Sequence, residues 1–292
     1  MDVGVCLPYM ERDYGRDEVL AWCRAIEDGP FTSLSCGERI TGYTLEMRNM
    51  LAFAAAATET VRIVPSLYVL PMHDPVWAAK EIATLDVLSG GRVTVTVGVG
   101  GREVDYRAVG ASFARRHARM DEQIARMREI WSGAPPFDGA DMVGPTPVQT
   151  GGPPILAGAM GPKAMARAAE WAQGVYSFSM NGEFDETKRF FDLARNAWSE
   201  AGRSERPRLV GGFWYSLADD AEARLHAYVH GYLKVFGPAM AEGVAKTMTR
   251  HTPEAVAEAI ANLERAGCDE IFLVPCTADI AEIERVKPLL PG

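Results

Sequence analysis

Short apolar segments alternate with helical segments at a regular spacing through the first third of the chain. The apolar segments begin near residues 2, 31, 61 and 92, so that each repeat takes about 30 residues. This is the length of one strand followed by one helix, and helical connections favour parallel strands. Asp74 and Pro75 are suited to open one of the helices, and Gly90 and Gly91 to close it. The chain is therefore predicted to be an α/β protein with a parallel sheet.

The alternation continues less regularly to the end of the chain and gives eight strands, which favours a closed (β/α)8 TIM barrel over an open sheet. Two gaps exceed the repeat, so insertions are expected after strands 4 and 7, at the carboxyl ends of the strands where barrels bind ligands. No linker or compositional break interrupts residues 1–292, which predicts a single domain. Strands are expected at 2–7, 31–36, 62–69, 92–97, 154–157, 174–177, 209–215 and 270–274, and helices at 17–27, 44–58, 75–88, 162–171, 183–201, from 219, and at 280–290.

Charge and composition exclude several classes of partner. The 292 residues include 30 basic and 39 acidic side chains, and the resulting net charge of −9 repels nucleic acid and anionic lipid at long range. The longest uncharged stretch, 142–162, is interrupted by proline and glycine and cannot form a membrane helix. No signal peptide is recognised, and the 5 cysteines contain no CxxC pair. We expect a cytoplasmic protein with reduced thiols and no nucleic-acid or membrane partner.

Two glycine-containing turns follow predicted strands and are candidates for ligand binding. The turn from Gly158 to Lys163 leads into a helix, where free backbone N–H groups, the helix dipole and one lysine can bind an anion such as phosphate. A plain tight turn explains the same residues equally well. The loop 98–101 allows a flat ligand to approach the backbone closely. The candidate residues are Gly98, Val99, Gly100, Gly158, Ala159, Met160, Gly161 and Lys163.

Several motifs together resemble the luciferase-like monooxygenase superfamily. The longest is Ala-Thr-Leu-Asp-Val-Leu-Ser-Gly-Gly-Arg at 83–92, followed by a strand and Gly-Val-Gly at 98–100. The segment Val-Leu-Pro-Met-His-Asp-Pro at 69–75 fits the same family. The shorter matches lie at 119–122, 154–158 and 252–256. Within the superfamily the chain is more similar to the branch that uses coenzyme F420, a deazaflavin, than to the flavin luciferases.

The resemblance implies a cofactor lying across the mouth of the barrel. Its ring is expected on a bulge in strand three, at a non-prolyl cis peptide bond between Ser66 and Leu67 or between Leu67 and Tyr68. The phosphate of the cofactor is expected at the Gly158–Lys163 turn. The cofactor implied is F420, with FMN as the alternative.

One position departs from the pattern of the family. Members that react through the deazaflavin often carry Asp-His at the end of strand two, where this chain has Glu38-Arg39. Arginine stays charged, so Arg39 cannot be a general base. It is expected to hold an anionic substrate or the ring oxygens of the cofactor, or else to pair with Glu38. Glu103 matches a glutamate that donates a proton in some relatives, and its alternative role is that of an exposed acid at a helix start.

Other residues carry weaker indications. His73 and Trp214 lie near expected strand ends and are candidates for the substrate pocket. His226 and His230 are spaced as a metal pair on a helix, but no third ligand is evident, so no metal is expected. The arginines between 115 and 128 alternate with acids and indicate a solvated helix face.

Three functions remain open at this level. The first is an F420-dependent oxidoreductase that transfers a hydride between C5 of the deazaflavin and a small organic substrate. The second is an FMN-dependent monooxygenase of the same superfamily, and the third is a protein that binds the cofactor without turnover. Because members of the superfamily are commonly dimers, a homodimer is expected.

Overall fold

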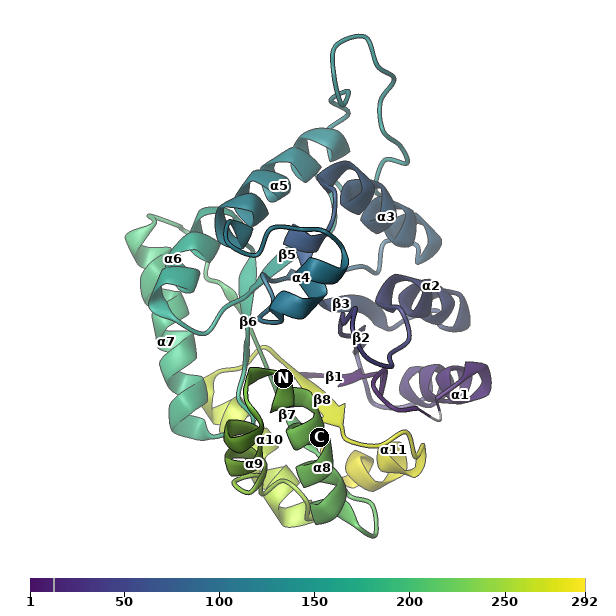
Figure 1. Cartoon of the computed structure of the whole chain (residues 1–292), viewed down its shortest axis with the longest axis vertical. Helices are drawn as coiled ribbons and strands as arrows, with labels where there is room; N and C mark the ends of the chain where they lie inside the picture. Colours follow the sequence, from purple (N-terminus) through teal and green to yellow (C-terminus); the bar gives the residue numbers. More distant parts are fainter. Residues whose placement is uncertain (13, 292) are drawn as a thin grey trace.

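The protein, described here by a computed structural model over residues 1–12 and 14–291, is a closed barrel of eight parallel strands in sequential order. The predicted (β/α)8 fold is confirmed, and Figure 1 shows the helices surrounding the strands. The strands are β1 (Asp2–Cys6), β2 (Ser33–Cys36), β3 (Arg62–Tyr68), β4 (Val95–Val97), β5 (Ile155–Gly158), β6 (Gly174–Phe178), β7 (Arg208–Tyr215) and β8 (Glu270–Pro275).

The helices agree with the predicted segments to within a few residues, and α4, α5, α9 and α10 are further helices in the two long gaps. The prediction for 75–88 is confirmed to the residue, since Asp74 Oδ1 accepts hydrogen bonds from the N–H groups of Val76 and Trp77. The helices are α1 (Arg16–Glu27), α2 (Met47–Ala57), α3 (Pro75–Leu88), α4 (Glu103–Ala108), α5 (Arg116–Trp131), α6 (Pro162–Trp171), α7 (Phe184–Glu200), α8 (Ala221–Leu233), α9 (Pro238–Ala245), α10 (Pro253–Ala266) and α11 (Ala281–Val286), with 3-10 turns η1 (Leu70–Met72), η2 (Lys234–Phe236) and η3 (Lys287–Leu289).

The extra length after β4 is divided between the two ends of the barrel. Helix α4 lies at the carboxyl ends of the strands, but α5 packs against α3 as the regular barrel helix. Residues 132–154 follow α5 and return to the start of β5, and Figure 1 shows them as a long loop projecting beyond α5. This loop is attached to α3, where Asp86 accepts hydrogen bonds from Gln149. The expectation that the whole insertion lies at the ligand-binding end is therefore wrong for its second half.

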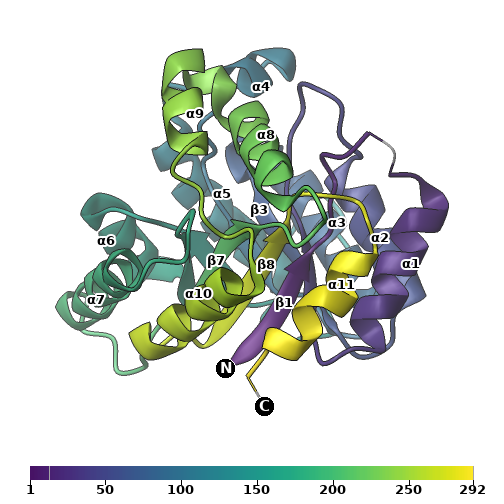
Figure 2. The same ribbon diagram turned by 90° about the horizontal axis from the view of Figure 1, so that it is seen from below.

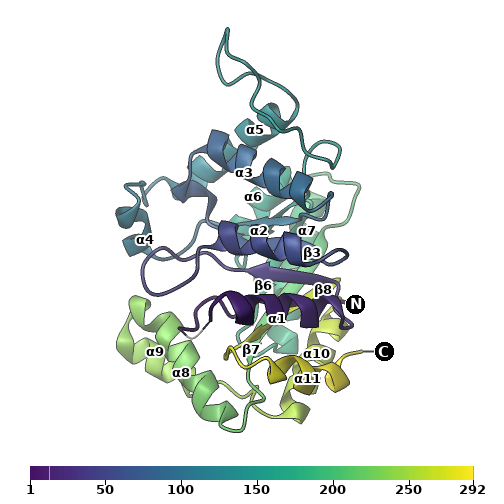
Figure 3. The same cartoon turned by 90° about the vertical axis from the view of Figure 1, so that its right-hand side faces the viewer.

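The insertion after β7 does cover the ligand-binding end. Helices α8 and α9 pack against each other and precede the barrel helix α10. Figure 2 shows α4, α8 and α9 together at one end of the barrel and both termini at the other. In the side view of Figure 3, α4 lies on one side of this end, and α8 and α9 lie on the other. The two insertions thus form the walls above the open end of the barrel.

A cluster of charges closes the opposite end of the barrel. Glu270 is 2% exposed, and its carboxylate forms ion pairs with Arg62 at 2.8 Å and with Arg208 at 2.9 Å. Both arginines also contact Asp2, and the Ser33 hydroxyl donates to Glu270. Each of these five residues is the first of its strand, so the strand starts converge on a single ionic cluster. Above it, an apolar layer fills the barrel interior, formed by Val64, Leu156, Val210 and Phe272.

Glu282, in α11, binds the segment that leads from β7 into α8 and thereby attaches the cover formed by α8 and α9 to the barrel. Its side chain is fully buried, and both carboxylate oxygens accept a hydrogen bond from the Leu217 N–H at 3.0 Å. Burial raises the pKa of Glu282 to about 7 from its ordinary value of 4.5. An acid whose pKa is raised by folding binds its proton more tightly in the native state, so its stabilising contribution is complete below pH 4.5 and is lost as pH rises through 7.

We therefore expect Glu282→Gln to reduce the fall in stability between pH 5 and pH 8. The pKa shift corresponds to a free energy on the order of 3 kcal/mol, so the free energy of unfolding of the variant should increase relative to that of the wild type as pH rises. Urea unfolding at both pH values measures this difference. The neighbouring variant Glu284→Gln, at an exposed side chain that pairs with Lys287, serves as the control and should follow the wild type. Parallel pH curves for wild type and Glu282→Gln would contradict the expectation.

Candidate functional site

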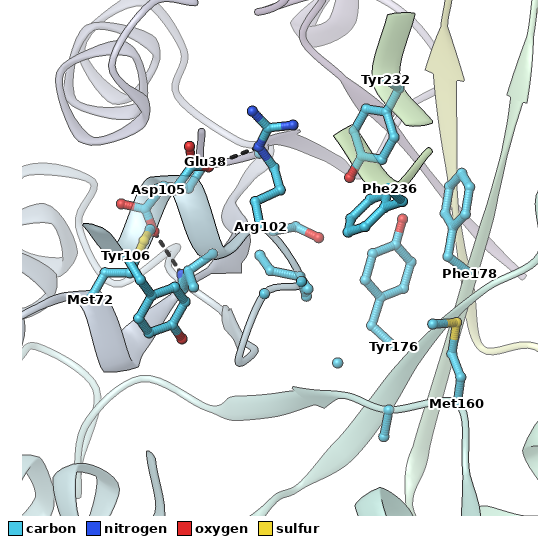
Figure 4. Close-up of a pocket in the computed structure, with 18 of the residues that line it drawn as sticks. Glu38, Met72, Arg102, Asp105, Tyr106, Met160, Tyr176, Phe178, Tyr232 and Phe236 are labelled. Carbon is cyan, nitrogen blue, oxygen red and sulfur yellow. Dashed lines mark hydrogen bonds and ion pairs between the residues drawn. The ribbon is translucent and has the colours of Figure 1, made fainter. Parts of the chain in front are cut away.

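A cavity of about 240 Å³ opens at the carboxyl ends of the strands, between α4 and the α8–α9 cover (Figure 4). Its walls combine backbone at glycine residues, aromatic rings and a few polar side chains. Because the charge cluster seals the other end of the barrel, ligands reach the strands from this side. The lining residues are Tyr9, Gly37, Glu38, Ser66, Leu67, Val69, Met72, Gly100, Gly101, Arg102, Asp105, Tyr106, Gly158, Ala159, Met160, Tyr176, Phe178, Tyr232 and Phe236.

The cavity brings together six of the residues expected to bind a cofactor. These are Ser66, Leu67, Gly100, Gly158, Ala159 and Met160. The non-prolyl cis peptide bond is present between Ser66 and Leu67, the first of the two expected positions. The remaining candidates lie outside the lining: Arg39, Gly98, Val99, Gly161 and Lys163. Lys163 is exposed in the first turn of α6.

Two of the glycines leave room for the Leu67 side chain, and one of them, Gly158, also lines the cavity. A Cβ atom at Gly98 would lie 2.7 Å from Leu67 Cδ1, and one at Gly158 would lie 2.7 Å from Leu67 Cδ2. The Leu67 side chain therefore fills the space that the sequence suggested for a flat ligand at Gly98. Gly100 has a φ of +60°, a conformation that favours glycine.

Glu38 and His73 form a hydrogen-bonded pair at the cavity wall. Glu38 Oε1 and His73 Nε2 are 2.7 Å apart, and Glu38 Oε2 accepts a hydrogen bond from the Val69 N–H at 2.7 Å. The Glu38 side chain is 3% exposed and that of His73 is 11% exposed. His73 also packs on Tyr68, with ring centroids 4.6 Å apart. His73, from the segment after the next strand, thus places an imidazole beside Glu38.

The two arginines near the mouth differ in their partners. Arg102 lines the cavity and binds Asp105 through Nε at 3.0 Å and Thr41 Oγ1 through Nη2 at 2.9 Å. Arg39 Nε donates to the Thr41 carbonyl at 3.1 Å, and within residues 1–12 and 14–291 Arg39 has no ion pair, so the expected alternative of a Glu38–Arg39 pair is wrong. Burial opposes the charge of Asp105, but hydrogen bonds from Thr41 and the charge of Arg102 outweigh it and lower the pKa of Asp105.

The structure separates two other predicted site residues from the cavity. Glu103 is the first residue of α4, its side chain is exposed to solvent, and it is not among the residues that line the cavity. Trp214 is 5% exposed and lines a second, smaller cavity of about 90 Å³ further inside the barrel. His73 reaches the main cavity only through Glu38.

Other ionisable groups have structural partners. In the part of the chain that the structure describes, no group of three His, Cys, Asp or Glu side chains is placed to hold a metal ion. His226 Nε2 instead contacts the Met248 carbonyl at 3.2 Å. All five cysteines are buried and unpaired. Among the helices described, none combines the length and the apolar character that crossing a bilayer requires.

Sequence reasoning missed several residues of the cavity. Asp105, Tyr106, Tyr232 and Phe236 come from the two insertions, and no motif marks them. The sequence marks Glu38 only as the replacement for the aspartate of the family and as a possible partner of Arg39. The available signal was position, since Glu38 and His73 follow the ends of adjacent strands and barrel sites are built there.

A closed parallel barrel with a mostly apolar cavity at the carboxyl ends of its strands defines the class of this protein, a (β/α)8 barrel with a cavity at its mouth. The chain belongs to the luciferase-like monooxygenase family, whose model matches residues 1–282.

Individual curated relatives match a smaller part of the chain than the family model does. An uncharacterized protein of Mycobacterium tuberculosis is 33% identical over 175 residues, which are 57% of this chain and 61% of that protein. The match thus spans less than two thirds of the relative.

Two solved structures share the fold over nearly the whole chain. An F420-dependent secondary alcohol dehydrogenase, in complex with an F420-acetone adduct, gives a TM-score of 0.79 at 20% identity and 99% and 98% coverage. The oxygenating constituent of 3,6-diketocamphane monooxygenase from Pseudomonas putida, in complex with FMN, gives 0.72 at 17% identity and 98% and 97% coverage. At these identities the likeness establishes the fold alone.

Proposed function

We propose that this protein is an enzyme, an F420-dependent oxidoreductase that transfers a hydride between C5 of the deazaflavin and a small organic substrate. The observation that carries the proposal is the Glu38–His73 pair at the wall of the cavity. Hydride transfer to a carbonyl, or from an alcohol, requires a group that exchanges a proton with the reacting oxygen. A buried carboxylate hydrogen-bonded to an imidazole supplies such a group although position 39 is arginine.

The cavity fits a flat ring with polar edges. Ser66 Oγ and Arg102 Nη1 are buried and have no hydrogen-bond partner among the residues described. Both residues line the cavity, so they are available to the oxygen and nitrogen atoms of a ring. Ser66 and Leu67 would support the ring, and the Gly158–Lys163 turn would hold the phosphate through the free N–H groups of the α6 start.

The bound deazaflavin would supply the hydride chemistry. The chain's own residues then have separate tasks. Glu38 Oε1 exchanges a proton with the substrate oxygen, and His73 Nε2 stabilises the carboxylate between transfers. The aromatic side chains of the cover, such as Tyr232 and Phe236, exclude water from the reacting atoms. Because Glu103 is exposed and outside the cavity, we place the proton transfer at Glu38.

The competing functions differ in the cofactor or in turnover. An FMN-dependent monooxygenase is the second candidate, since a relative of the same fold is in complex with FMN. A cofactor-binding protein without turnover needs no proton-transfer group, so the Glu38–His73 pair favours an enzyme.

Binding titrations with F420 and with FMN test the proposal. We expect the protein to bind F420 more tightly than FMN when binding is measured by fluorescence quenching. We also expect F420-coupled turnover with a panel of small alcohols and ketones.

In the same titration, Lys163→Ala should weaken F420 binding by about 10-fold through the loss of one charge-assisted contact. Lys287→Ala, which removes a lysine paired with Glu284, should bind as the wild type does. Tighter FMN binding with oxygen consumption would refute the F420 assignment, and unchanged affinity in Lys163→Ala would refute the phosphate site.

We further propose that the protein acts as a homodimer in the cytoplasm. Five buried, unpaired thiols agree with a reducing compartment. Sedimentation of the purified chain would measure the oligomeric state.

A further inference from the structure

Arg102 has one free nitrogen at the main cavity, while its other two nitrogens are held by the protein. Nε donates to Asp105 at 3.0 Å, and Nη2 donates to Thr41 Oγ1 at 2.9 Å. Nη1 is buried and has no hydrogen-bond partner among the residues described. The Arg102 side chain is 16% exposed and lines the cavity, as Figure 4 shows. A buried guanidinium N–H group without a partner is costly, so a ligand that accepts from Nη1 would be stabilised there.

Asp105 and Thr41 fix the orientation of this guanidinium group. Asp105 is 3% exposed, and its Oδ1 also accepts a hydrogen bond from the Thr41 N–H at 2.9 Å. Thr41 lies in the loop after β2 and Asp105 lies in α4, so two separate segments of the chain hold the group. Because a guanidinium group is planar and rigid, holding two of its nitrogens also sets the direction of the third. The free nitrogen is therefore positioned before a ligand binds.

Arg39 adds a second positive charge beside the same wall of the cavity. Its Nε donates to the Thr41 carbonyl at 3.1 Å, so Thr41 is a partner of both guanidinium groups. Burial raises the pKa of the Tyr232 phenol, and the charges of Arg39 and Arg102 act in the opposite direction. Since Tyr232 lines the cavity, both positive charges act on the space where a ligand would lie.

The charged groups at this wall differ in whether they have a counterion in contact. Arg102 is paired with Asp105, and Glu38 with His73. Arg39 forms no ion pair in the part of the chain that the structure describes. The chain as a whole has a net charge of −9, so an arginine without a counterion at the mouth is a local exception. A planar monoanion such as a carboxylate matches this site, because guanidinium groups bind carboxylates through charge-assisted hydrogen bonds.

We propose that the substrate carries a carboxylate, which binds at the mouth of the cavity between Arg102 Nη1 and the guanidinium group of Arg39, with the Tyr232 hydroxyl as a further donor. This substrate class rests on the proposed oxidoreductase function, whereas the anion site can be tested without any cofactor. Arg102 Nη1 carries two N–H groups, so a contact with a cofactor ring leaves one of them for the carboxylate. The apolar part of the substrate would pack on Phe178 and Phe236, which line the same cavity.

The test compares isobutyrate with isobutyramide, which have the same shape and differ in charge, on the full chain without cofactor. NMR of protein with 15N-labelled arginine side chains reports binding at the guanidinium groups. We expect the wild type to bind isobutyrate about 10-fold more tightly than the amide, since charge-assisted hydrogen bonds are stronger than neutral ones. The Nε–H signals of Arg102 and Arg39 should shift, and added salt should weaken the binding of the acid but not of the amide.

Arg102→Lys and Arg39→Gln should each reduce the ratio of the two affinities by about 5-fold. The lysine side chain keeps a positive charge beside the buried Asp105 and lacks Nη1, so this variant should fold. A structural defect would weaken both ligands alike, so the ratio isolates the contact with the charge. Arg115→Gln is the matched control, because it removes an arginine charge at an exposed side chain that pairs with Glu122, and it should leave the ratio unchanged.

Three results would overturn the proposal. The first is equal affinity of the wild type for the acid and the amide, and the second is an unchanged ratio in both variants. The third is loss of isobutyrate binding when F420 is bound, which would assign the two arginines to the cofactor. The first two are read without cofactor, so they are distinct from failure of F420 to bind. The expected ratios in a protein that does not bind F420 would support the anion site and refute only the oxidoreductase.

Discussion

Replacing Glu38 by glutamine should reduce the rate of F420-coupled turnover by about 10²- to 10⁴-fold, the usual contribution of a positioned acid or base. The amide keeps the shape of the side chain, and its oxygen can still accept the hydrogen bond from the Val69 N–H. The variant should therefore fold and bind cofactor as the wild type does. Rates under saturating cofactor, measured against pH with the alcohol or ketone that the wild type turns over, give the effect.

Glu103→Gln is the matched control, since it makes the same chemical change at an exposed acid outside the cavity. It should leave both the rate and the pH profile unchanged. His73→Gln should give a smaller loss and alter the pH profile, because His73 acts through Glu38. If Glu38→Gln retains the wild-type rate while Glu103→Gln loses it, the proton-transfer role belongs to Glu103.

Glu270→Gln should lower the free energy of unfolding by about 2–4 kcal/mol. Removing one partner of a buried ion pair costs about 3–5 kcal/mol, and the cost is smaller here because Arg62 and Arg208 are about one third exposed and keep Asp2 as a partner. Urea denaturation at pH 7 measures the difference. The effect is structural, so cofactor affinity below the unfolding transition should not change.

An exposed pair serves as the comparison. Asp192 contacts Lys188 and Arg195 on the surface of α7, and Asp192→Asn should change stability by no more than about 1 kcal/mol. A loss below 1 kcal/mol in Glu270→Gln would mean that the strand starts hold together without this charge cluster.

Local signals in the sequence were sufficient for most of the fold. The α3 boundaries followed from the Asp74 cap, Pro75 and the glycines after the helix. The expected helix at 44–58 instead begins at Met47, because the Glu46 side chain accepts hydrogen bonds from the N–H groups of Arg48 and Asn49 and caps the helix there. Such errors are small because they move an end and leave the order of elements intact.

The roles of the glycines and of the long gap could not be predicted in the same way. Gly98 and Gly158 look like ligand contacts in the sequence, yet both lie against the Leu67 side chain, and of the two only Gly158 lines the cavity. The gap after β4 gives no sign that α5 divides it between the two ends of the barrel. Both outcomes depend on which side chains fill the space, and packing between distant segments leaves little trace in a single sequence.

The sequence by itself determined the eight-strand barrel, the family motifs and the absence of a histidine at position 39. The family resemblance narrowed the cis peptide bond to two positions, of which the structure has the one between Ser66 and Leu67. Only the tertiary structure decided that His73 lies beside Glu38. Glu38 and His73 are 35 residues apart, and they meet because β2 and β3 are adjacent parallel strands whose carboxyl ends reach the same rim. Strand register brings the two side chains within hydrogen-bond distance, and register is a property of the closed sheet that the local sequence around either residue does not contain.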